Sequence, residues 1–141
     1  MGTHGIQIVG KGGNLPELMA EVLERMPAEV VSRFCSARPM VRIEQTLPVP
    51  TTSGALFSDD FEDADPCFLI EIDSDDRLVL HLSAARADWM DFQEIRGMLT
   101  AALAGLLMQI SLAPSADIET LADAWGLKIE LNDYLRFKFG R

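Results

Sequence analysis

A glycine cluster near the start of the chain, residues 10–13, is the first place where the sequence suggests chemistry. A short apolar run at 6–9 precedes it, and Asn14 can cap a helix that follows. A strand, a glycine turn and a helix can direct free backbone amides and the positive helix end toward an anion. The glycine spacing matches neither the phosphate-loop pattern nor the dinucleotide pattern. Two interpretations therefore stay open: a structural turn, or a phosphate or carboxylate site formed by Lys11, Gly12 and Gly13.

Cys67 and His81 form the second pair with potential chemistry, because they lie near the two ends of a predicted hairpin. If the register sets them opposite each other, the imidazole can take the thiol proton, as in nucleophilic catalysis. A register shift of two residues between the strands would keep the same side chains on each face but would separate Cys67 from His81. The alternative is a buried cysteine near an exposed strand histidine. With Cys35 and His4 there are four potential zinc ligands, but they lack zinc-site spacing, so we expect no metal or cofactor.

The segment 51–65, TTSGALFSDDFEDAD, is rich in turn-forming and acidic residues. A calcium loop needs alternating oxygen ligands, a central glycine and a final glutamate, and the order Asp59, Phe61, Asp63 breaks that alternation. The composition therefore predicts an exposed acidic loop. Two aromatic residues within it are candidate apolar anchors for a protein partner: Phe57 and Phe61.

A long uncharged stretch, 97–116, separates Arg96 from Asp117. Its apolar residues are not confined to one stripe, so a helix here must be covered on more than one side. Small residues four positions apart let another backbone approach closely. Two interpretations of that seam stay open, close packing within the chain and a subunit contact; its residues are Gly97, Ala101 and Gly105.

Apolar residues at helical spacing predict the helices that must position these groups. The first runs from residue 15 to 26, and Pro27 predicts a kink or a restart before the helix ends near residue 35. Asp88 can cap the long helix, whose expected core face includes Phe92, Ile95 and Leu99. A shorter helix is expected at 116–125. The nearby group Trp89, Met90, Phe92 and Trp125 fits either core packing or a ligand pocket.

Alternating apolar residues predict the strands. One short strand is expected at 40–44. Two hairpins are expected at about 67–82 and 127–139, the first pairing Ile70 with Leu78 and the second pairing Ile129 with Phe137. The sequence therefore predicts one α+β domain over residues 1–141, with helices packed on a mainly antiparallel sheet built from these two hairpins.

Composition narrows the range of partners. The 141-residue chain carries 22 acidic and 12 basic residues, a formal net charge of -10. Nucleic acids and anionic lipid surfaces need clustered cations, so we expect neither as a partner. The N-terminus lacks the basic and apolar regions of a signal peptide, and Pro114 interrupts the uncharged stretch. We therefore expect a cytoplasmic protein with reduced cysteines and no membrane span.

The functional hypothesis follows from excess apolar helix surface without a recognisable catalytic set. It is a non-enzymatic protein-association module, either a homodimer or an adaptor or chaperone-like binder of another protein. The seam of small residues would form the close contact, with the two loop phenylalanines as secondary anchors. The alternative is a small-molecule or anion-binding domain, with or without enzymatic activity, that uses the glycine cluster 10–13.

Overall fold

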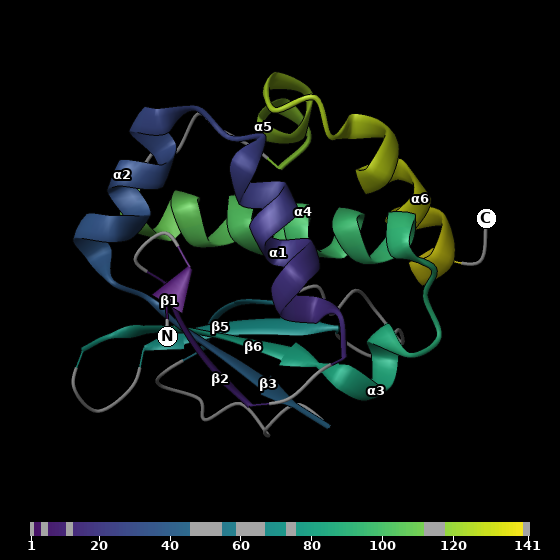
Figure 1. The fold of residues 1–141 in the computed structure, drawn as a ribbon, viewed down its shortest axis with the longest axis horizontal. Helices are drawn as coiled ribbons and strands as arrows, with labels where there is room; N and C mark the ends of the chain where they lie inside the picture. Colours follow the sequence, from purple (N-terminus) through teal and green to yellow (C-terminus); the bar gives the residue numbers. More distant parts are fainter. Residues whose placement is uncertain are drawn as a thin grey trace.

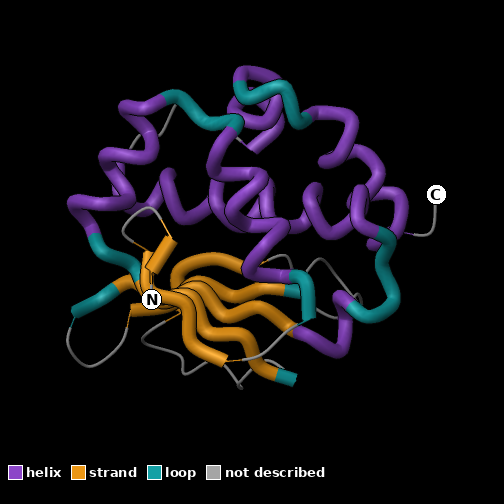
Figure 2. The backbone as a smooth tube through the Cα atoms, in the orientation of Figure 1, coloured by secondary structure: helices purple, strands orange, loops and turns teal. Residues whose placement is uncertain are grey.

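The computed structural model describes residues 2–3, 6–10, 13–45, 55–58, 67–72, 76–111 and 118–139. Within these residues, helices form a layer over one face of a sheet (Figures 1 and 2). The strands are β1 (Gly2–Thr3), β2 (Ile6–Gly10), β3 (Met40–Glu44), β4 (Ala55–Ser58), β5 (Phe68–Ile72) and β6 (Leu78–Ser83). The helices are α1 (Leu15–Glu24), α2 (Ala28–Ala37), α3 (Ala84–Ala87), α4 (Phe92–Ser111), α5 (Ile118–Ala124) and α6 (Lys128–Phe139).

The sheet is mixed, with the strand order β1-β2-β3-β6-β5-β4. Among its longer strands, β2 pairs with β3 and β3 pairs with β6 in parallel, whereas β5 and β6 are antiparallel. The prediction of a mainly antiparallel sheet built from two hairpins is therefore wrong. The chain leaves β2, passes through α1 and α2, and returns along β3, and a helical crossover of this kind joins parallel strands.

The hairpin predicted at 67–82 is confirmed, but its register differs from the predicted one. Ile70 lies opposite Leu80 instead of Leu78, so the pairing is shifted by two residues and the same side chains still share a face. Arg77 directly precedes the first residue of β6. Its Nε donates to the Arg38 carbonyl at 2.8 Å and its Nη2 donates to Gln7 Oε1 at 3.1 Å, which connects this end of the hairpin to α2 and β2.

The hairpin predicted at 127–139 is wrong, because residues 128–139 form the helix α6. Leu127, Leu131 and Tyr134 are buried at spacings of four and three residues, which is the helical period. Ile129, which the strand prediction placed on the apolar face, is 68% exposed. Over so short a segment, alternation and helical spacing fit many of the same residues, and packing on α4 selects the helix.

The predicted interruption of the first helical segment at Pro27 is confirmed. α1 ends at Glu24, and α2 begins at Ala28 with Pro27 as its N-cap. The predicted side-chain caps are wrong at two places. Asn14 makes no side-chain capping hydrogen bond, and Asp88 lies at the C-terminal end of α3 instead of the start of α4.

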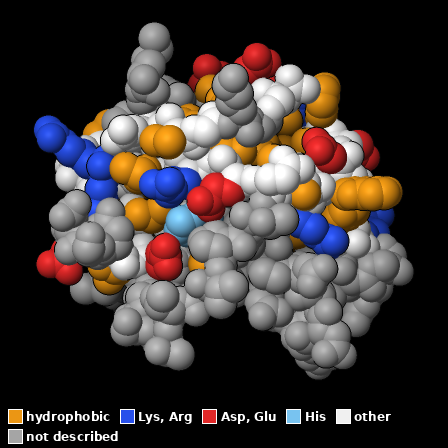
Figure 3. All heavy atoms as spheres, turned by 90° about the horizontal axis from the view of Figure 1, so that it is seen from below, with side chains coloured by type: hydrophobic (Ala, Val, Ile, Leu, Met, Phe, Trp, Pro, Cys, Tyr) orange, Lys and Arg blue, Asp and Glu red, His pale blue; other side chains and the backbone are white. Residues whose placement is uncertain are grey.

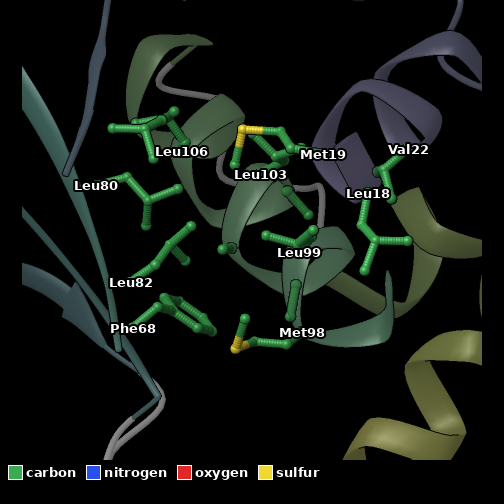
Figure 4. Close-up of a cluster of buried hydrophobic side chains, with 14 of the residues drawn as sticks. Leu18, Met19, Val22, Phe68, Leu80, Leu82, Met98, Leu99, Leu103 and Leu106 are labelled. Atoms are coloured by element: carbon green, nitrogen blue, oxygen red, sulfur yellow. The ribbon is translucent and has the colours of Figure 1, made fainter. Parts of the chain in front are cut away.

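The long helix α4 is the centre of the core. It contacts β5 and β6 on the sheet, and it contacts α1, α2, α5 and α6 in the helical layer. Figure 4 shows its leucines between side chains of the sheet and of α1. This arrangement explains why its uncharged sequence has no single apolar stripe. No helix among the described residues is both long enough and apolar enough to cross a membrane. The labelled core residues are Leu18, Met19, Val22, Phe68, Leu80, Leu82, Met98, Leu99, Leu103 and Leu106.

Candidate interaction surface

The largest apolar side chains at the described surface include two aromatics on one turn. Trp89 is 79% exposed and Phe92 is 55% exposed, and they lie three residues apart where α3 ends and α4 begins. We call residues 88–92 the aromatic turn. An isolated exposed leucine is ordinary in a folded protein, but a tryptophan this exposed leaves a large apolar surface in water.

Local hydrogen bonds fix the path of the aromatic turn. Ser83 caps α3 by accepting a hydrogen bond from the Arg86 amide at 3.2 Å. The amides of Trp89 and Met90 donate to carbonyls of α3 at 3.2 and 3.0 Å. Because Ala87 and Met90 are both buried, the turn is held at two points and Trp89 between them is directed to the surface.

A reciprocal capping box starts α4 immediately after the turn. The Glu94 amide donates to Asp91 Oδ1 at 2.8 Å, and the Asp91 amide donates to Glu94 Oε1 at 2.9 Å. Helix α4 therefore begins at Phe92, whose side chain is 55% exposed, whereas Ile95 on the same turn is buried. The prediction that Phe92 lies on the core face is wrong for this reason.

The sequence of the aromatic turn and of its flanking residues is acidic. Asp88 and Asp91 are exposed and Glu94 is half-buried, and the segment 87–95 contains no lysine or arginine. The nearest basic residues in sequence have contacts elsewhere. The Arg86 guanidinium lies 5.8 Å from the ring centroid of Phe137, and Arg96 pairs with Glu21 at 3.2 Å.

The four residues Trp89, Met90, Phe92 and Trp125 separate into two pairs in the structure. Met90 and Trp125 are buried in the core, whereas Trp89 and Phe92 lie at the surface. The Asp91-x-x-Glu94 spacing is the sequence signal that would have located the start of α4 and placed Phe92 at its exposed end.

The seam of small residues lies inside the chain. Gly97 packs against the Glu130 backbone and the Tyr134 side chain of α6, so that a β-carbon at position 97 would collide with them. Ala101 and Gly105 are also buried. Of the two interpretations that the sequence left open, close packing within the chain describes these positions.

The other predicted site residues are scattered. Phe57, expected on a loop, lies in β4 and pairs with Ile70, while Phe61 lies outside the described residues. Lys11 and Gly12 also lie outside them. Gly13 is exposed and has a φ of 53°, a left-handed conformation that favours glycine. The anion site at 10–13 therefore stays a prediction.

His81 does not face Cys67 across the hairpin. The register places Leu69 opposite His81, and the Cys67 carbonyl instead accepts a hydrogen bond from the Ser83 amide at 3.0 Å. The His81 ring lies between two carboxylates, with Nδ1 2.8 Å from Glu44 Oε2 and Nε2 2.7 Å from Glu71 Oε1. Because both ring nitrogens have carboxylate partners, the ring has no free nitrogen to take a thiol proton.

The His81 cluster connects three adjacent strands on the sheet face opposite the helices. Glu44 belongs to β3, His81 to β6 and Glu71 to β5. Figure 3 views this face and shows a histidine between acidic side chains. The two carboxylates approach opposite nitrogens of one ring, so they hold the imidazole from two sides. The ligands of a shared metal ion would instead converge on one point. The described residues contain no cluster of three histidine, cysteine or acidic side chains that could hold a metal ion.

Comparisons with known proteins assign no family to this chain. No family model matches it, and neither a curated protein nor a solved structure does so. Its function is therefore inferred from the side chains described above.

Proposed function

We propose that this protein acts by binding another protein through the aromatic turn, as a non-enzymatic association module. The observation that supports this proposal is the 79% exposure of Trp89 next to the buried Met90 of the same turn. Self-association and an adaptor or chaperone-like role both belong to this proposal. The proposal does not rely on the predicted seam, since Gly97, Ala101 and Gly105 are buried within the chain.

The energetics favour an interface at this turn. Burying a large apolar side chain on association contributes about 1.5–3 kcal/mol, and tryptophan is among the residue types enriched in the few positions that dominate binding energy. The large aromatic side chains of Trp125 and Tyr134, by contrast, are buried. Trp89 is therefore exposed although backbone hydrogen bonds to α3 fix the turn that carries it.

The His81 cluster supports a structural role better than a catalytic one. A general base needs an imidazole nitrogen that can accept a proton from a substrate. The contacts of His81 with Glu44 and Glu71 occupy both nitrogens, and only 6% of its side chain is exposed. These contacts support the non-enzymatic form of the proposal.

Quantitative co-purification tests the proposed function. Wild-type protein, Trp89→Ala and Ile129→Ala are immobilised separately, and the bound proteins are compared by mass spectrometry. Ile129 is a matched control because it is an exposed apolar residue on α6, away from the aromatic turn in sequence. We expect a set of proteins that Trp89→Ala loses and Ile129→Ala keeps. Identical sets for all three proteins, together with an unchanged solution mass, would contradict the proposal.

A further inference from the structure

We infer that the partner of the aromatic turn is a basic amphipathic segment of another protein, with lysine or arginine beside apolar side chains, and not a second copy of this chain. This inference rests on the proposed function. It adds the chemistry of the partner, which follows from the charges around Trp89.

The first argument is charge complementarity. Three carboxylates, from Asp88, Asp91 and Glu94, lie within seven residues that include both exposed aromatics. The positive end of α4 offsets only about half an elementary charge of this field. A partner that buries Trp89 must bring its own groups close to these carboxylates, so cations beside its apolar anchor are favoured and anions are disfavoured.

The two capping carboxylates remain available for such contacts. In the capping box, one oxygen of Asp91 and one oxygen of Glu94 each accept a backbone amide. A carboxylate offers about four acceptor positions on its two oxygens, so each group can accept further hydrogen bonds from a lysine or arginine. The capping bonds also hold these carboxylates in place, which reduces the entropy lost on binding.

The indole of Trp89 adds a second attraction for cations. A cation over an aromatic face gains about 0.5–2 kcal/mol, and tryptophan is the strongest acceptor of this contact. The neighbouring element already contains such a contact, because the Arg86 guanidinium lies 5.8 Å from the Phe137 ring centroid. An arginine or lysine of the partner can make the same kind of contact with Trp89.

A second copy of the chain fits this surface poorly. In a two-fold symmetric dimer the same patch meets itself, so that Asp88, Asp91 and Glu94 would approach their own counterparts. The chain as a whole carries a formal net charge of -10, which adds long-range repulsion between copies. Both effects act against self-association at the aromatic turn and in favour of a basic partner.

The test uses three synthetic helical peptides and fluorescence anisotropy. The first has leucines on one face and lysines on the other, the second replaces every lysine by glutamine, and the third scrambles the leucine and lysine order. We expect the amphipathic leucine-lysine peptide to bind best. We also expect Trp89→Ala and Asp88→Lys each to weaken its binding roughly tenfold, and raised salt to weaken it further. Ile129→Ala and Asp123→Lys, both at exposed positions elsewhere, should leave it unchanged.

The possible failures are distinguishable. If the glutamine peptide binds as tightly as the lysine peptide, and Trp89→Ala weakens both, the turn is an interface but the basic partner is wrong. A dimer that light scattering finds in the wild type and not in Trp89→Ala would also overturn the basic partner while keeping the proposed function. Binding of the scrambled peptide with equal strength, insensitive to Trp89→Ala, would overturn the inference as nonspecific attraction. If no peptide binds, no dimer forms and co-purification is insensitive to Trp89→Ala, both proposals are wrong.

Discussion

Nε2 of His81 lies 2.7 Å from Oε1 of Glu71, although the two residues are not opposite each other in the β5–β6 register. Their side chains therefore meet diagonally across the pair of strands. The opposite ring nitrogen contacts Glu44 on β3 in the same way. One imidazole thus joins an antiparallel strand pair to a parallel one.

We expect Glu71→Gln to lower the free energy of unfolding by about 1–2 kcal/mol, because a hydrogen bond to a charged group is replaced by a neutral one beside a buried ring. Urea denaturation would measure this loss. Glu29→Gln is a matched control, because Glu29 is exposed on α2. Equal effects of the two substitutions would show that the His81 cluster contributes no more than a surface charge.

We expect Gly97→Ala to destabilise the protein by at least about 1 kcal/mol. Alanine gains about 1 kcal/mol over glycine in helix propensity, but here its β-carbon would collide with the α6 backbone, which cannot rotate away as a side chain could. Thermal unfolding and solution mass should be measured together. Lower stability at unchanged mass agrees with packing inside the chain, whereas a change in mass with unchanged stability would indicate a subunit contact. Asn132→Ala, exposed on α6, serves as the control.

The ion pair between Arg25 and Glu130 should stabilise the contact of the α1 end with α6. Arg25 Nη1 lies 3.2 Å from Glu130 Oε2 and also donates to the Gly126 carbonyl at 3.3 Å. Because Glu130 is buried, we expect Arg25→Ala to cost about 1–3 kcal/mol. A double-mutant cycle with Glu130→Gln would measure the coupling by urea denaturation. Additive effects would show that the two side chains act independently.

Two neighbouring aspartates should differ in their contribution to α4. Asp91→Ala removes the N-cap and should cost about 1 kcal/mol, whereas Asp88→Ala should change stability by less than about 0.5 kcal/mol. Denaturant unfolding of both variants compares them directly. The reverse order would restore Asp88 as the cap, which is the residue that the sequence first suggested.

Local patterns predicted some elements at residue resolution. β3 spans Met40–Glu44, as expected, since its alternation and its flanking prolines are both local signals. The α1–α2 break at Pro27 and the shared faces of β5 and β6 are also local. Strand order was not predictable in this way, because the parallel pairing of β2 with β3 depends on a contact that the two helices between them create.

The aromatic turn and α6 show a second limit of periodicity. Phe92 continues the helical spacing of Ile95 and Leu99, yet it lies at the end of α4 and its side chain is 55% exposed. Spacing gives the direction of a side chain around a helix, but it does not give how far the core extends along that helix. In α6 the opposite problem arises, because Ile129 fits an alternating pattern that the packing of Leu127 and Leu131 overrides.

The position of α4 determines how the protein can open. Its contacts include α1 and α2, which precede it in the chain, and α5 and α6, which follow it. The middle of α4 therefore cannot reach water by the loss of one neighbouring helix. In hydrogen-deuterium exchange its amides should be among the slowest, exchanging only when nearly the whole molecule unfolds, while the ends of the helical layer exchange by local fraying.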